Sequence, residues 1–242
     1  RHIFIASGER QKFDPAQNMG TNLGKIVRLT LDGGTPPDNP FAQQGGVTAQ
    51  IWSLGHRNVL GLAFDKTGQL WDDEMGPEGG DEVNLVTRGG NYGWPVREAT
   101  TCFNKTAVTQ PLETCATQSA YGDTFLDPVL EYRRDFGRSV IGGYVYRGAA
   151  LPELYGRYLF VDWVSNNEIG SNQIYYADIL PPEAGLWELV PVPLTRPDGS
   201  ALPSFYTLSF GQDAGGEMYV LTADYYNPVG SSGKVYKIVP AP

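Results

Sequence analysis

The chain has 242 residues, of which 41% are hydrophobic, so it is long enough to bury at least one sizeable core. Its formal net charge of −9 at pH 7 and its pI of about 4.7 argue against nucleic acid as a partner, because an acidic surface repels phosphate. No stretch approaches the ~18 consecutive apolar residues that a membrane helix needs, so we expect no membrane span.

The chain is predicted to be built from short strands. Its 30 glycines and 18 prolines are typical of tight turns, and helical periodicity is hard to find beyond one turn. Apolar runs rich in β-branched and aromatic residues recur, each ended by Gly, Pro, Asp or Asn. In chain order these expected strands are 2–7, 25–31, 50–54, 62–65, 69–73, 82–86, 143–148, 157–163, 173–179, 205–210, 217–222 and 234–240.

Three segments share a strand–turn–strand layout, at 62–74, 144–163 and 208–224, and 24–29 is echoed by 233–238. Imperfect repeats of short strands are typical of radial or stacked β architecture. A β-propeller fits best, because each of its blades takes four strands, and the strands found here make up about four blades, the first incomplete. A β-sandwich is the structural alternative, but it does not explain why the same pattern recurs.

The longest irregular stretch, 93–127, contains both cysteines of the chain. It is too long for an ordinary connection, so we expect a functional loop over one face of the propeller. Cys102 and Cys115 lie in polar surroundings with twelve residues between them, which favours a disulfide worth about 3 kcal/mol and an oxidising compartment. Two unrelated surface thiols remain the alternative. Zinc is disfavoured, since neither cysteine has a Cys or His partner at zinc spacing.

The densest group of polar and glycine motifs lies between 55 and 95. Arg57 beside Asn58 offers a fork of donors and an amide, which suits a planar polyanionic or carbonyl-rich ligand. Gly76-Pro77 predicts a turn with outward carbonyls, and calcium accepts such oxygens together with nearby carboxylates. A structural ion pair and a plain turn explain the same residues, so their chemistry alone does not decide.

Several of these motifs follow one another as in a known family. They are GHRNVLGLAF (55–64), EMGPEGGDEVNLV (74–86) and GGNYGWP (89–95), with further similar stretches at 7–41, 127–163 and 210–240. Over nearly its whole length the chain resembles the soluble PQQ-dependent aldose sugar dehydrogenases (the glucose/sorbosone dehydrogenases). The resemblance implies an all-β fold, a six-bladed β-propeller with PQQ near its axis and calcium beside the quinone. The chain would hold roughly the last four blades as a single, N-terminally incomplete propeller domain, 1–242.

The resemblance also implies roles for individual residues. Arg57 and Asn58 fall where the family contacts the quinone oxygens of PQQ. Gly76 and Pro77 fall where backbone carbonyls hold the calcium that polarises the cofactor.

Three further positions complete the implied binding set. Glu82 and Tyr92 fall where some relatives hold another calcium, and Arg147 falls near a lysine that contacts a PQQ carboxylate in a relative. The family's catalytic histidine lies upstream of this chain, so neither His2 nor His56 is assigned as the base. We therefore expect a buried, hydrogen-bonded or exposed structural role for them, and no activity from this chain alone.

The function implied by the resemblance is PQQ- and calcium-dependent oxidation of aldose sugars at C1 to the lactone. Electrons would pass to an external acceptor, in a periplasmic or secreted setting. One departure favours the alternative, a non-catalytic β-propeller that binds a carbohydrate or protein partner. Relatives bind the PQQ carboxylates with basic residues in two stretches that here, at 164–173 and 202–210, contain no Lys or Arg.

Overall fold

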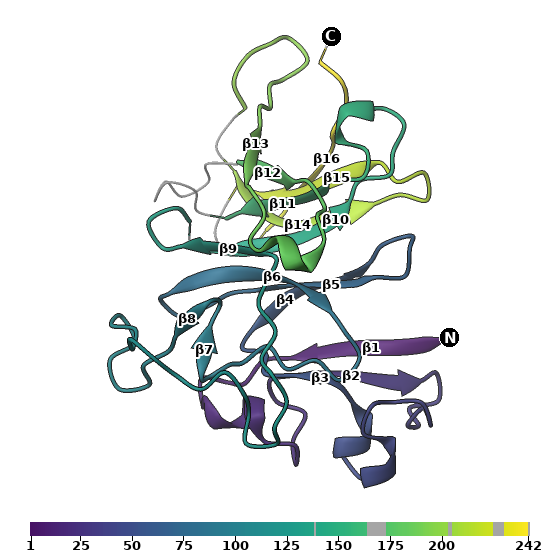
Figure 1. Cartoon of the computed structure of the whole chain (residues 1–242). Helices are drawn as coiled ribbons and strands as arrows, with labels where there is room; N and C mark the ends of the chain where they lie inside the picture. Colours follow the sequence, from purple (N-terminus) through teal and green to yellow (C-terminus); the bar gives the residue numbers. More distant parts are fainter. Residues whose placement is uncertain (138, 164–172, 203–204, 225–229, 242) are drawn as a thin grey trace.

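The computed structural model describes residues 1–137, 139–163, 173–202, 205–224 and 230–241. Over these ranges all regular elements are β-strands or single turns of 3-10 helix (Figure 1). The strands are β1 (His2–Ser7), β2 (Lys25–Thr30), β3 (Ile51–Leu54), β4 (Val59–Phe64), β5 (Leu70–Glu74), β6 (Gly80–Val86), β7 (Arg97–Glu98), β8 (Thr101–Cys102), β9 (Leu130–Arg133), β10 (Val140–Val145), β11 (Tyr158–Asp162), β12 (Ile174–Ala177), β13 (Val190–Val192), β14 (Tyr206–Gln212), β15 (Met218–Ala223) and β16 (Lys234–Lys237). The 3-10 turns are η1 (Asp14–Gln17), η2 (Ala42–Gln44), η3 (Thr48–Gln50), η4 (Pro152–Leu154) and η6 (Pro182–Ala184).

The strands form antiparallel sheets that follow one another along the chain. In the described residues their strand orders are β1-β2-β3, β4-β5-β6-β9, β10-β11-β12-β13 and β14-β15-β16, with β7-β8 as a separate hairpin. The first strands of successive sheets contact one another, from β1 through β4 and β10 to β14. Gly61 and Gly142 permit one such approach, because a Cβ on Gly61 would lie 2.8 Å from the Cα of Gly142.

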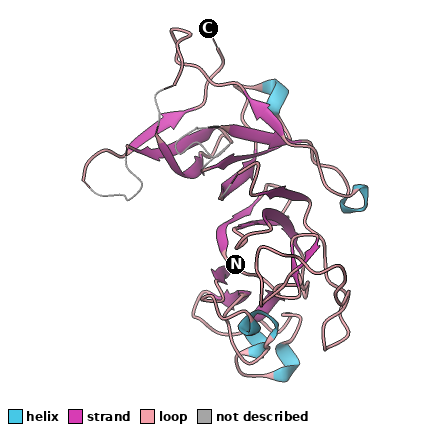
Figure 2. Ribbon diagram, turned by 90° about the vertical axis from the view of Figure 1, so that its left-hand side faces the viewer, coloured by secondary structure: helices cyan, strands magenta, loops and turns pink. Residues whose placement is uncertain are grey.

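The core lies between the sheets. Trp71 of β5 stacks on Tyr158 of β11 with ring centroids 4.6 Å apart, which joins the second sheet to the third. Successive residues of β11 point to opposite faces, so Phe160 packs toward the second sheet and Leu159 toward the fourth. Figure 2 shows the resulting layers of strands from the side. Repeated sheets that are buried face to face confirm the all-β expectation, while a closed ring of six blades stays a prediction.

The three predicted strand–turn–strand segments are the hairpins β4–β5, β10–β11 and β14–β15, each at the start of its sheet. The sequence reading missed β7, β8, β9 and β13. The first two have two residues each, and β13 contains Pro191 and pairs only with β12, at the edge of its sheet.

The stretch 93–127 is a long excursion between β6 and β9. The disulfide predicted within it is present, with the Cα atoms of Cys102 and Cys115 5.5 Å apart. Among the described residues, no helix has the length and apolar character needed to cross a bilayer.

Candidate functional site

The start of β4 and the turn after β5 bring the predicted ligand-binding residues together. Asn58 accepts a backbone hydrogen bond from Met75 at 3.1 Å, and Arg57 Nη1 donates to the Met75 carbonyl at 2.5 Å. These two contacts place Arg57 and Asn58 directly beside Gly76 and Pro77. The structure therefore unites four of the residues that the sequence singled out.

Arg57 has a largely buried side chain and keeps one donor without a hydrogen bond to any described residue. Its side chain is 14% exposed, lies over the Trp94 ring at 5.8 Å and is 3.9 Å from Glu9 Oε1. Its Nε atom is buried and has no hydrogen-bond partner in the described part of the chain. Burial lowers the pKa of Arg57, and nearby carboxylates, Glu9 foremost, oppose that shift. A buried guanidinium with an unused donor suits an anionic or carbonyl-rich ligand.

The turn that carries Gly76 is held by an ion pair which sequence reasoning missed. The Gly76 N–H donates to Asp81 Oδ1 at 3.0 Å. Arg134 donates to the Gly76 carbonyl and pairs with Asp81 at 2.7 Å. A Cβ at Gly76 would lie 1.9 Å from the Gly80 carbonyl oxygen, so only glycine fits. Nothing in the sequence around Arg134 indicated this contact, because β9 follows a long excursion from β6.

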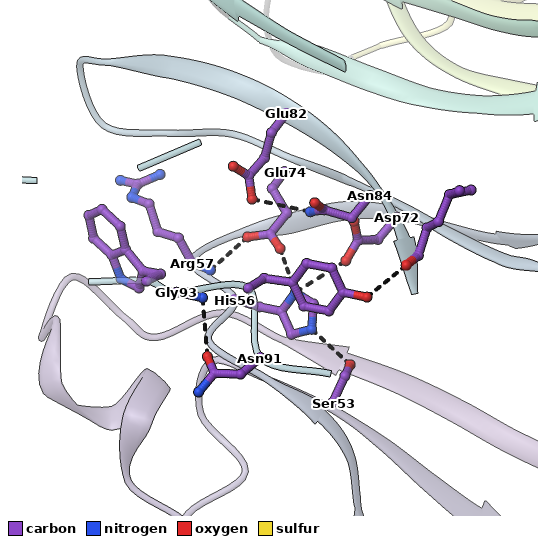
Figure 3. Close-up of polar contacts among 12 residues, drawn as sticks. Ser53, His56, Arg57, Asp72, Glu74, Glu82, Asn84, Asn91 and Gly93 are labelled. Atoms are coloured by element: carbon purple, nitrogen blue, oxygen red, sulfur yellow. Dashed lines mark hydrogen bonds and ion pairs between the residues drawn. The ribbon is translucent and has the colours of Figure 1, made fainter. Parts of the chain in front are cut away.

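Beneath this turn lies a buried acidic cluster around His56 (Figure 3). His56 Nδ1 is 2.5 Å from Glu74 Oε1 and 3.1 Å from Asp72 Oδ2, and Nε2 is 2.8 Å from Ser53 Oγ. Burial alone would lower the pKa of His56, but the charge of Glu74 and the contacts with Asp72 raise it to about 10. Burial, reinforced by the charge of Glu74, raises the pKa of Asp72 to about 6. His56 is thus a fully buried imidazolium bound on both nitrogens, as the structural interpretation predicted.

Glu82 and Tyr92 border the same cluster. Glu82 Oε1 accepts from Asn84 Nδ2 at 3.1 Å, and burial followed by the charge of Glu74 raises the Glu82 pKa well above its usual range. The Tyr92 ring stacks on His56 with centroids 4.8 Å apart. The Tyr92 hydroxyl donates to the Leu85 carbonyl of strand β6 at 2.7 Å, so its proton is already used in a hydrogen bond. Tyr92 could therefore offer a metal only its backbone carbonyl.

Arg147 lies away from Arg57 and the turn at 76–80, whereas the resemblance implies that both arginines contact one ligand. β4 and β10 lie side by side: Ser139 before β10 contacts Met75, whereas Arg147 after β10 pairs with Asp65 after β4 at 3.5 Å. Arg57 precedes β4, so the strand separates the two arginines by about 20 Å at ~3.3 Å per residue. This distance is set by how β4 and β10 align along each other. The residues next to Arg147 in the sequence do not reveal that alignment.

The first residues of the excursion at 93–127 reach the site, and a functional role of the whole loop stays a prediction. Trp94, Arg97, Glu98 and Ala99 line a small cavity together with Arg57, Glu74, Met75, Gly76, Gly80 and Glu82. Of the two stretches that lack basic residues, 164–172 lies outside the described residues, while Tyr206–Phe210 belongs to β14.

Comparison with known proteins gives a consistent family. The family model for glucose/sorbosone dehydrogenases matches residues 1–174. Quinoprotein glucose dehydrogenase B of Acinetobacter calcoaceticus is 53% identical over 75 residues, which are 31% of this chain and 15% of that protein. The HIPL2 protein of Arabidopsis thaliana is 30% identical over 261 residues, covering 93% of this chain and 34% of that protein.

A solved structure supports the same fold. The soluble aldose sugar dehydrogenase of Escherichia coli, in its apo form, superimposes with a TM-score of 0.71 at 30% identity. The match covers 98% of this chain and 60% of that one. The chain thus spans less than two thirds of the length of each of these three relatives.

Proposed function

The chain belongs to the glucose/sorbosone dehydrogenase family, and on this premise we propose that the protein oxidises aldose sugars at C1 to the lactone with PQQ and calcium. Electrons pass to an external acceptor, in a periplasmic or secreted setting. Support comes from the family match over residues 1–174 and from a relative named as a quinoprotein glucose dehydrogenase. PQQ supplies the hydride acceptor, and calcium beside it supplies a Lewis acid.

Arg57 carries the proposal. Among the described residues, Arg57 Nε has no hydrogen-bond partner, although it faces the Glu9 carboxylate at 3.9 Å, and the buried Nη1 of Arg134 has no hydrogen-bond partner either. Two arginines that contact neighbouring backbone carbonyls and each keep such a donor fit a ligand with quinone oxygens and carboxylates. Asn58 adds an amide beside them, and the Trp94 ring over Arg57 limits the access of water.

The turn and the buried carboxylates fit a hard cation. Calcium takes backbone carbonyls and carboxylate oxygens, and we assign the carbonyls of Gly76 and Pro77 to the ion beside the cofactor. The Gly76 carbonyl also accepts from Arg134, and it retains a second lone pair. Glu82 and the Tyr92 carbonyl are the proposed ligands of a second calcium.

No catalytic base is assigned within this chain. His56 is fully buried and its two nitrogens contact Ser53, Asp72 and Glu74, so it cannot take a proton from a bound sugar. The protonated His56 instead holds Glu74, whose other oxygen accepts from the Arg57 backbone N–H at 2.7 Å. The cluster thereby orients the residue that meets the cofactor.

Calorimetric titration of PQQ into the full-length protein, with calcium present, tests the proposal. We expect saturable binding that weakens at least 100-fold in Arg57→Ala, because a buried charged hydrogen bond with no substitute is lost. Arg147→Ala is the matched control and should bind PQQ as the wild type does. Equal binding by the wild type and Arg57→Ala would remove the assigned role.

A second candidate is a non-catalytic propeller that binds a carbohydrate or protein partner. The HIPL2 protein matches nearly the whole chain, and its name implies no dehydrogenase. The pairing of Arg147 with Asp65, away from Arg57, supports this candidate, because the resemblance assigns Arg147 to a PQQ carboxylate. Absence of PQQ binding by the full-length wild type would favour this candidate.

A further inference from the structure

Glu98 makes the most concentrated set of contacts to the turn at 76–80. Its Oε1 accepts backbone hydrogen bonds from Glu78 at 3.1 Å, Gly79 at 2.6 Å and Gly80 at 3.2 Å. Glu98 is 5% exposed. Burial raises the pKa of its carboxyl group, and the three N–H donors oppose the shift by stabilising the anion. A buried carboxylate is stable here because the turn folds around it as an anion-binding concavity.

The shape of the turn depends on this carboxylate. A Cβ at Gly76 would lie 2.5 Å from Glu98 Oε1, and a Cβ at Gly79 would lie 2.7 Å from Glu98 Oε2. On the other side the same turn is held by Asp81 and Arg134. The backbone that presents the Gly76 and Pro77 carbonyls is therefore fixed from both sides by charged groups, of which Glu98 and Asp81 are buried.

A small hairpin presents Glu98 to the turn. β7 and β8 pair Glu98 with Thr101, and the Thr101 hydroxyl donates to the Glu98 carbonyl at 2.9 Å. Ala99 lies between them at φ +50°, a conformation that costs a non-glycine residue free energy and persists where the surroundings enforce it. The hairpin ends at Cys102, which the disulfide to Cys115 ties to the rest of the excursion.

We propose that Glu98 is a positioning residue that fixes the 76–80 turn in the shape in which its carbonyls bind the cofactor's calcium. The inference rests on the proposed function and adds to it a residue of the excursion to which the resemblance gives no role. Its effect is on the affinity for the ion and not on the sugar. The excursion thus acts on the metal site through the backbone of the turn.

The test compares Glu98→Ala, Glu98→Gln and the control Glu78→Ala, whose side chain is exposed on the same turn. In the full-length protein without cofactor, hydrogen exchange of the Gly79 and Gly80 amides should speed up at least tenfold in Glu98→Ala. Calorimetry with calcium alone should give Glu98→Ala a Kd for calcium at least tenfold above that of the wild type. Glu98→Gln should recover most of both, because its amide oxygen still accepts the N–H groups. Glu78→Ala should match the wild type.

The outcomes separate this inference from the proposed function. Calcium binding by the wild type with an unchanged Kd in Glu98→Ala overturns the role of Glu98 while the proposed function stands. An equal loss in Glu78→Ala also overturns it, because the effect would then belong to the turn in general. A wild type that binds neither calcium nor PQQ overturns the proposed function and the metal role together, whatever the exchange rates show.

Discussion

Strands β5 and β11 occupy the same place in neighbouring sheets, yet the middle of each strand buries a different kind of side chain. Each is the second strand of its sheet, and every residue of both is buried. β11 reads YLFVD and fills two apolar clusters, whereas β5 reads LWDDE and buries Asp72, Asp73 and Glu74. The fifth residue is acidic in both strands, Glu74 and Asp162. The fold therefore does not require acidic residues at the third and fourth places, since a phenylalanine and a valine fill them in β11.

The buried carboxylates of β5 reduce the stability of the fold. Burying a carboxylate without a full set of partners costs free energy, and the pKa values of Asp72 and Asp73 rise chiefly because of burial. In β11 the same positions carry residues such as Phe160, which packs near Tyr132, Tyr158 and Tyr175. We infer that β11 mainly stabilises the fold, while β5 supports the site around Arg57.

Truncating β11 should produce the largest loss of stability. Phe160→Ala removes a fully buried ring, so the free energy of unfolding should fall by about 3–5 kcal/mol. Denaturant unfolding of the full-length protein measures this, with Tyr121→Ala, 64% exposed, as a control expected within about 0.5 kcal/mol of the wild type. PQQ affinity of the folded variant should not change. A loss below about 1 kcal/mol would show that β11 is not the stabilising strand.

Changing one acidic residue of β5 should reduce stability less than Phe160→Ala does, and it should also weaken PQQ binding. Glu74→Gln removes the charge that faces His56 and weakens the acceptor of the Arg57 N–H, so we expect a loss of about 3 kcal/mol. The pKa of His56 should fall, and PQQ should bind more weakly because Arg57 is less well oriented. Glu78→Gln, a change on the exposed part of the turn, is the matched control. Unchanged PQQ binding in Glu74→Gln would separate the cluster from the site.

The repeating hairpins were readable from the sequence because local patterns determine them. Alternating apolar residues and glycine turns located β4–β5, β10–β11 and β14–β15 without reference to distant parts of the chain. The fourth strand β9 was not identified, because it joins its sheet after the excursion at 93–127. Its pairing with β6 depends on tertiary contacts that strand propensity does not encode.

The sequence predicted only those site residues that lie close together in the chain or belong to the family motifs. Arg57 and Gly76 were found that way, and the structure places them together. Arg134 and Glu98 were missed, because both act on the turn at 76–80 from later segments. Arg147 was expected near the same ligand, yet the inner strands carry it to the opposite end.

The smallest predicted effect concerns Asp72, and it separates charge from packing in β5. Asp72→Asn keeps the shape of the side chain and removes a fully buried charge, so stability should change by no more than about 1 kcal/mol. The His56 pKa of about 10 exceeds the ordinary value of about 6.5. Protonated His56 therefore stabilises the fold fully below pH ~6.5, and this contribution is lost as the pH rises through about 10.

Because Asp72 contributes to that raised pKa, Asp72→Asn should lower it and move the loss of stability to lower pH. NMR titration of the His56 imidazole measures the pKa directly, and unfolding at pH 7 and pH 9 measures its consequence. Asp73→Asn is the control, since Asp73 faces Gly61 and Gly142 on the other side of β5. If both variants lower the His56 pKa equally, the combined negative charge of β5 raises that pKa. The direct contact between Asp72 and His56 would then have no separate effect on it.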